Sequence, residues 1–406
     1  MIFEKKYIWI SIAVSCSLLI ASCSNDEPQT AGEAPLRKIE LEAFQLDYLQ
    51  ATNKFADNLW SQLNQSEPKT VNFVFSPLSL QMNLSLLANA ADGESQQELI
   101  NVLLPDFGGE GTIEKLNELN HKLLQDLPST DAKAKIKIAS SVWVDRNIEL
   151  KQSFGDRTQC YGSILFRFTP NTADALNDIN KWFSKTTDGM MGEVFKVLPE
   201  GDVLFINALC FHHTWSRPFD SSKTKENWFY SESGNTSKVE MLNDAFTGKV
   251  FASEKAWMIR LPYGNGAFVM ELYKPLENFD VSEAVSAGVG EPYDCRIILS
   301  MPKFKFTHEV DFRDVLKSMG VEKALDGFGR LTHLTDNILK IDKIIQKTLI
   351  EVDEKGTKVE TYSSINMPGD YIPPSTVDFN LNHPFGFIIR ETSTGAVIAM
   401  GKICEL

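Results

Sequence analysis

Residues 72–80 read Asn-Phe-Val-Phe-Ser-Pro-Leu-Ser-Leu, and this stretch places the centre of the fold. Ser76 is the expected N-cap of a helix, and Pro77 suits its first turn, where an N–H would in any case lack a partner. The helix that follows is apolar on most of its sides until Asp92-Gly93 stops it. The pattern predicts a central helix that is buried all round.

The segments around this helix predict strands and helices in mixed order. Residues 203–211 are apolar on both faces, as in a central strand covered on both sides. We expect further strands at 136–144, 296–300 and 341–352, a hairpin formed by 385–389 and 396–403, and helices at 41–63 and 172–186. This order predicts one α+β domain covering residues 40–406.

Composition bounds the classes of partner. The chain has 406 residues, is 43% hydrophobic and carries a formal net charge of −14, so it can bury a large core and would repel a phosphate backbone. We therefore expect no nucleic-acid partner. Four cysteines, Cys160, Cys210, Cys295 and Cys404, are far apart without a CxxC pair, and free thiols are favoured over disulfides or a metal site.

The N-terminus has the pattern of an export signal. Lys5 and Lys6 precede an apolar run over residues 7–21, which is short for a bilayer span. The run ends Leu-Ile-Ala-Ser-Cys at Cys23, which resembles the bacterial lipobox. The interpretation is a signal peptide at 1–22, lipidation at Cys23 and a flexible tether over 23–39; ordinary signal cleavage is the alternative. The protein would then be exported and held at the outer membrane or cell surface by its lipid.

Signatures of catalysis are not found. The sequence contains no GxSxG, HExxH or P-loop motif, and its six histidines lack metal-ligand spacing. His212 and His213 lie near a strand end beside Trp215, where a structural role is favoured over a ligand pair. We expect no enzyme, no metal and no cofactor.

Five short segments together resemble the serpin family of protease inhibitors. They are residues 72–80, quoted above; Asn207 to Phe211 followed by Trp215 to Phe219; Met301-Pro302-Lys303-Phe304; Asp353-Glu354-Lys355-Gly356-Thr357; and Asn382-His383-Pro384-Phe385 with Met400-Gly401-Lys402. They occur in the family's order and spacing over essentially the whole chain after the tether.

The resemblance implies a fold and a mechanism. The fold would have three β-sheets, eight or nine helices and an exposed reactive-centre loop at about 354–376. In serpins a serine or cysteine protease attacks this loop and forms an acyl-enzyme, and the cut loop then inserts as a new strand into the main sheet. The protease is trapped covalently, and the inhibitor supplies no catalytic group. We expect a metastable, monomeric inhibitor.

The loop has the alternation that insertion requires, because successive side chains of a strand point to opposite faces. The set that would face inward is small or apolar: Thr357, Val359, Thr361, Ser363 and Ile365. The other set is polar or amphipathic: Lys358, Glu360, Tyr362 and Ser364. The segment, Thr357 included, is expected to be exposed before cleavage. Val359, Thr361 and Tyr362 are bulkier than the Ala-rich run usual in inhibitory serpins, and bulk would slow insertion.

The resemblance also implies roles for residues outside the loop. Glu354 and Gly356 belong to the hinge, and Lys303 and Trp215 form a latch where the loop enters the sheet. A second cluster controls the opening of the sheet and contains Ser76, Ser79, Asn207 and Gln346. The family usually has histidine at the last position, and glutamine cannot titrate near neutral pH.

The scissile bond is expected between Asp370 and Tyr371. The family's usual loop length and the Ile372-Pro373-Pro374 sequence both give this register. Aspartate there would suit an acid-preferring protease. Cleavage after Tyr371, for a chymotrypsin-like target, and after Met367, for an elastase-like target, are the alternatives, within a window that ends at Ile372.

A second function is compatible with the same fold. Some serpins do not inhibit proteases and act as binding or interaction modules. These members tend to carry charged or bulky side chains at the inward hinge positions. Thr357, Val359 and Thr361 are neither, which favours the inhibitor.

Overall fold

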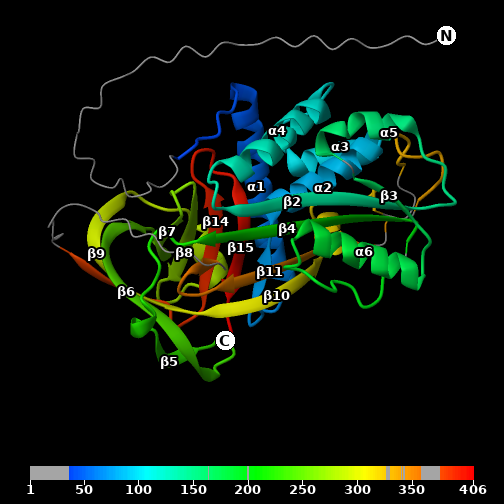
Figure 1. Cartoon of the computed structure of the whole chain (residues 1–406). Helices are drawn as coiled ribbons and strands as arrows, with labels where there is room; N and C mark the ends of the chain where they lie inside the picture. Colours follow the sequence, from blue (N-terminus) through cyan, green and yellow to red (C-terminus); the bar gives the residue numbers. More distant parts are fainter. Residues whose placement is uncertain are drawn as a thin grey trace, which may run out of the picture. The chain divides into compact units, whose positions relative to one another are not determined.

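A computed structural model describes residues 36–162, 164–198, 201–325, 330–339, 341, 343–357 and 375–406 (Figure 1). The predicted signal peptide, Cys23, most of the tether, the loop positions Val359 and Thr361 and the expected scissile bond at Asp370 and Tyr371, with Met367 and Ile372, lie outside these residues.

Eight α-helices occur in the described part of the chain. They are α1 (Ala43–Ser66), α2 (Pro77–Ala90), α3 (Gly93–Leu103), α4 (Thr112–Asp126), α5 (Gln152–Arg157), α6 (Ala173–Thr186), α7 (Val281–Ser286) and α8 (Arg313–Ser318). Among them no helix combines the length and the apolar character needed to cross a membrane.

The strands form two large sheets. The first has the order β1-β15-β14-β8-β7-β6-β9-β13, with β5 paired to β6. Its strands are β1 (Phe73–Phe75), β5 (Lys225–Tyr230), β6 (Thr236–Ala252), β7 (Ala256–Tyr263), β8 (Phe268–Pro275), β9 (Pro292–Pro302), β13 (Thr376–Asn380), β14 (Phe385–Glu391) and β15 (Val397–Ile403). The hairpin of β14 and β15 is the one predicted from the sequence.

The second sheet has the order β10-β11-β4-β2-β3. Its strands are β2 (Lys135–Asp145), β3 (Leu165–Phe168), β4 (Val203–Thr214), β10 (Phe304–Asp311) and β11 (Ile344–Val352). A short strand, β12 (Gly356–Thr357), pairs with the end of β4 and makes a third, small ladder. The predicted α+β architecture with three sheets is confirmed.

The central strand and the central helix occupy the predicted places. Ser76 Oγ accepts a hydrogen bond from Ser79 N at 3.1 Å and caps α2, and every residue of α2 is buried. Along β4 the side chains of Phe205 and Leu209 join the main core, which α2 shares, while those of Ile206 and Ala208 face a second core that includes α6. Both helices can be followed in Figure 1. The two-sided covering explains why β4 lacks alternation.

One boundary differs from the prediction. Ile39, expected at the end of the tether, is 6% exposed, and its N–H donates to Ser393 Oγ at 3.0 Å. The folded domain therefore begins before residue 40. An apolar residue at the edge of a polar linker gives little sign of burial, because its partner is more than 300 residues away in sequence.

Candidate functional site: a slot between two strands

The central sheet contains a slot along one edge of β4. β4 pairs with β2 from Val203 to His212, but it pairs with the parallel strand β11 only at Phe205, Ile206 and Asn207. Beyond Gln346, β11 continues to Val352 and pairs only with β10. Two strands in one sheet thus diverge, and the edge of β4 from residue 208 to 211 has no partner strand among the described residues.

The hinge already occupies the mouth of this slot. Gly356 pairs with Thr214 and Thr357 with His213, antiparallel to β4. Gly356 must be glycine, because its φ is +148° and a Cβ would lie 2.3 Å from the carbonyl oxygen of His213. The backbones of the hinge and of β4 are therefore in close contact.

Thr357 corrects an expectation. It was predicted to be exposed before cleavage, yet it is 5% exposed, and its Oγ1 lies 2.9 Å from the hydroxyl of Tyr263. The first inward rung is formed in the intact chain. A charged side chain at Thr357 would therefore disturb the uncleaved state as well as any inserted one.

Glu354 and Lys303 are brought together beside the slot. Lys303 Nζ lies 3.3 Å from Glu354 Oε1 and 3.2 Å from Glu240 Oε2, and Thr224 Oγ1 donates to Glu354 Oε1 at 2.9 Å. Burial alone would raise the pKa of Glu354, but its own backbone N–H, Thr224 and Lys303 outweigh this, and the pKa is lowered. Glu354 is therefore a carboxylate held by several donors.

Trp215 joins the same region to the hinge backbone. Its indole Nε1 donates to the carbonyl of Asp353 at 3.0 Å, and its backbone N–H donates to the carbonyl of Lys355 at 2.9 Å. Its ring stacks on Tyr263, with centroids 4.4 Å apart and planes inclined by 15°. Trp215 therefore fixes the chain just before the first paired residue.

The predicted opening cluster assembles where β4 and β11 meet. Gln346 Oε1 accepts from Ser76 N at 2.7 Å, and Gln346 Nε2 donates to Ser76 O at 3.0 Å. Asn207, which pairs with Gln346 across the strands, donates to Ser79 O at 2.9 Å. Asn207 Oδ1 and Ser79 Oγ are buried without a hydrogen-bond partner among the described residues. Gln346 and Asn207 thus bind the backbone of Ser76 and Ser79, while these two buried oxygens remain available for a further hydrogen bond.

Sequence reasoning missed Tyr263, Thr224 and Asp131, which belong to no motif. It favoured a structural role for His213 but did not identify its partner. His213 Nε2 lies 3.0 Å from Asp131 Oδ2, and both side chains are almost completely buried. An Asp and a His 82 positions apart give no local signal, although a histidine next to a Trp at a strand end was a usable hint.

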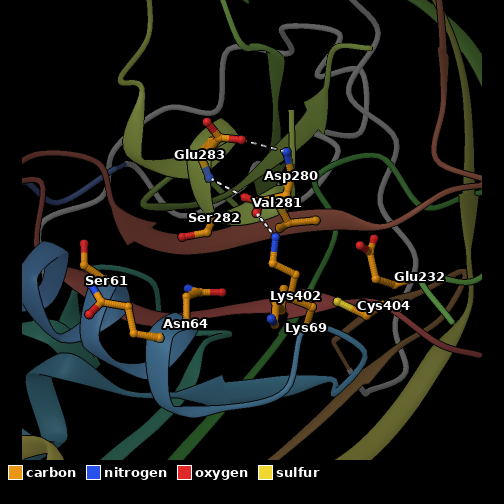
Figure 2. A pocket seen from close by; sticks show the side chains of 11 residues that line it. Ser61, Asn64, Lys69, Glu232, Asp280, Val281, Ser282, Glu283, Lys402 and Cys404 are labelled. Atoms are coloured by element: carbon orange, nitrogen blue, oxygen red, sulfur yellow. Dashed lines mark hydrogen bonds and ion pairs between the residues drawn. The ribbon is translucent and has the colours of Figure 1, made fainter. Parts of the chain in front are cut away.

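A separate cavity of about 300 Å³ lies between α1, α7 and the end of β15, and Figure 2 shows its lining. Lys69 Nζ pairs there with Asp280 Oδ2 at 3.1 Å, and Asp280 and Glu283 form a capping box at the start of α7. None of the sequence-predicted site residues line this cavity. The described residues also contain no group of three or more His, Cys, Asp or Glu side chains that could bind a metal.

The comparisons with known proteins agree with this geometry. The family model described as "Serpin (serine protease inhibitor)" matches residues 50–406. The wheat protein Serpin-Z1C is 28% identical over 383 residues, covering 86% of this chain and 94% of its own length. The native-state crystal structure of tengpin, a thermophilic serpin, superposes with a TM-score of 0.78 at 26% identity, covering 92% of this chain and 97% of tengpin. Thyroxine-binding globulin in complex with thyroxine has a TM-score of 0.77 at 20% identity, covering 88% of this chain and 98% of its own, a likeness of fold alone.

The chain belongs to the serpin family. Membership of this family supports a protease-inhibitor function in general terms, and serpins as a family are protease inhibitors and not catalytic enzymes.

The pair of Glu354 and Lys303 generates a prediction. Its side chains are 19% and 29% exposed, so we expect the pair to contribute about 1 kcal/mol. Glu354→Lys should place two ammonium groups together and release the hinge, giving several-fold more polymer on mild heating, measured by native gel electrophoresis. The charge swap Glu354→Lys with Lys303→Glu should restore part of the loss. Glu240→Gln, which removes only the outer partner of Lys303, is the control. Equal polymerisation of wild type and Glu354→Lys would contradict the role of this pair.

Proposed function

We propose that the protein is an inhibitory serpin that traps a protease as a covalent acyl-enzyme by inserting its cleaved loop into the slot between β4 and β11. The observation that carries the proposal is the unpaired edge of β4 with the hinge already docked at its mouth. A strand edge without a partner strand is a template for another strand, and serpin loop insertion is one form of this strand addition.

The register of the docked hinge supports insertion. Thr357 lies opposite His213, so continuing the antiparallel ladder would place Val359 opposite Phe211, Thr361 opposite Leu209 and Ser363 opposite Asn207. Directly opposed residues share a face of the sheet. Leu209 belongs to the main core and Phe211 packs against it, and this is the face that the small and apolar loop positions would meet.

The same register predicts where insertion would meet the opening cluster. Reaching Asn207 would require separating β4 from β11 at the pairs that Gln346 and its neighbours form. Ser363 would then arrive opposite Asn207, whose Oδ1 has no partner among the described residues. A hydroxyl there would fill a buried acceptor, and each satisfied buried group contributes about 1 kcal/mol.

The free energy available is sufficient. Roughly ten new ladder hydrogen bonds at ~1 kcal/mol each give on the order of 10 kcal/mol. Burying Val359 and Ile365 adds ~1.5–3 kcal/mol each. This is comparable with the stability of a whole domain, so the uncleaved state would be metastable.

The proposal is tested with a panel of serine and cysteine proteases, read on denaturing gels. We expect at least one protease to give a covalent complex, with cleavage within Met367 to Ile372. N-terminal sequencing of the released fragment should start at Tyr371, which corresponds to cleavage after Asp370. Cleavage by every protease without any complex would refute inhibition and favour the non-inhibitory alternative.

A matched pair of loop variants tests insertion itself. Thr361→Arg would bury an unpaired charge on insertion, which costs several kcal/mol, and each kcal/mol slows a step about five-fold. The variant should be cleaved at the normal rate but trap far less protease. Glu360→Arg adds the same side chain at a neighbouring outward position and should trap like wild type. Equal trapping by Thr361→Arg would mean that this position does not enter the sheet.

We further propose that the chain is a bacterial lipoprotein, exported and anchored through Cys23 at the outer membrane or cell surface. The lipobox-like residues before Cys23 support this. Two or more acyl chains on one cysteine would anchor it stably, because a single chain binds membranes only marginally. Cys23→Ala should release a soluble form or leave an unprocessed precursor. Cell fractionation decides, and an unchanged mature protein in the membrane fraction would rule out this anchor.

A further inference from the structure

The hinge rests on a buried pair that the family motifs do not contain. Asp131 precedes β2, and its carboxylate accepts the backbone N–H groups of Lys133 and Asn265 at 2.8 Å each. His213 Nε2 lies 3.0 Å from the same carboxylate. Gly264 leaves room for the pair, since a Cβ there would lie 2.3 Å from both Asp131 Oδ2 and His213 Cε1.

Hydrogen bonding fixes the form of the imidazole. His213 Nδ1 accepts the backbone N–H of Thr214 at 3.0 Å, so this nitrogen carries no proton and Nε2–H donates to Asp131. The last residue of β4 that pairs with β2 is His212, so Thr214 lies beyond the end of the β2–β4 ladder. A neutral ring therefore serves both contacts, and a protonated ring cannot accept from Thr214.

Two routes lead from this ring to the hinge. The imidazole lies parallel to Tyr263, with planes inclined by 10° and centroids 5.9 Å apart, and the Tyr263 hydroxyl contacts Thr357 Oγ1. The backbone of residues 213–215 also packs on Gly356. A Cβ added to Gly356 would lie within 2.8 Å of a backbone atom of each of these three residues. A shift at His213 or Thr214 would thus reach both docked residues of the hinge.

We propose that Asp131 and His213 are positioning residues for loop insertion: the neutral imidazole of His213, held by the Asp131 carboxylate, keeps Gly356 and Thr357 at the mouth of the slot, and protonation of His213 releases them. The consequence for trapping rests on the proposed inhibitory function, whereas the docking itself is a property of the intact chain. Without the docked rung, insertion starts later, and a larger share of the acyl-enzyme is hydrolysed.

The surroundings of the ring set the direction of the pH effect. Burial lowers the pKa of His213, nearby Asp131 opposes this, and Lys133 adds to the lowering. Burial alone would raise the pKa of Asp131, but its backbone N–H donors and His213 outweigh it, and that pKa is lowered. The imidazole also contacts three aromatic rings, those of Phe211, Tyr263 and Phe268. A lowered pKa means that the docked state favours the neutral imidazole. His213 therefore stabilises docking fully at a pH above its pKa in the unfolded chain, and this stabilisation is lost as the pH falls through the lowered pKa.

The test follows the hinge amides by hydrogen exchange and mass spectrometry in the intact protein, from about pH 8 to about pH 5, corrected for the intrinsic exchange rate. Exchange of residues 353–357 in wild type should rise about five-fold toward acid, the effect of losing one net hydrogen bond. The number of inhibitor molecules consumed per trapped protease should rise in parallel.

Three variants make the test specific. His213→Gln should show no acid transition, and Asp131→Asn should shift the transition to lower pH, because it removes the charge that favours protonation. His308→Gln is the matched control: His308 is also buried with a lowered pKa, but its Nδ1 contacts Val74 O in another part of the core. It should retain the wild-type profile.

The outcomes separate the two proposals. If wild type traps no protease at any pH, the proposed function fails, while the exchange measurement still decides the role of the pair. A flat wild-type exchange profile, or an acid transition that survives in His213→Gln, would overturn the inference. If His213→Gln does not fold, Asp131→Asn takes its place in the test. An acid transition at the wild-type pH in Asp131→Asn would then overturn the inference.

Discussion

The structure depends on one incomplete strand pairing. β4 and β11 are neighbours in the central sheet, yet they share only the rungs at residues 205–207 and 344–346. From residue 208 to 211 this edge of β4 has no partner strand among the described residues, although both faces of the strand are packed by core side chains. Buried backbone N–H and C=O groups need partners, and under the proposed function the inserted loop would supply them along this edge.

Side-chain contacts lie at both ends of the slot. At one end Gln346 ties β11 to the start of α2 through Ser76, and at the other Glu354 is held by Lys303 and Thr224. Thr357 of the hinge is already paired with β4, and its side chain contacts the hydroxyl of Tyr263, whose ring stacks on those of Trp215 and His213. Because these contacts are few and individually weak, modest changes at this end of the sheet are expected to alter the rate of opening more than the fold.

Much of the fold could be predicted from local pattern. The apolar run of β4 and the Ser76-Pro77 start of α2 follow from periodicity and capping, and Glu354, Lys303 and Gln346 follow from the family resemblance. The burial of Thr357 could not be predicted, because it arises from pairing with His213, 144 positions away in sequence. Tyr263 and the Asp131–His213 pair were missed for the same reason: isolated aromatic, acidic and imidazole side chains acquire their role only from contacts across elements. Sequence patterns predict the helices and strands, whereas the site is formed by contacts between side chains on different elements.

The central claim is that the slot accepts the loop, and comparing the thermal unfolding of the intact chain with that of the chain cut in its loop tests it most directly. Cleavage of an ordinary surface loop leaves the unfolding midpoint unchanged or lowers it, because it removes a chain constraint. Insertion would add a strand worth on the order of 10 kcal/mol in ladder hydrogen bonds. The account predicts a large rise in the midpoint after cleavage between Met367 and Ile372. An equal or lower midpoint would contradict it.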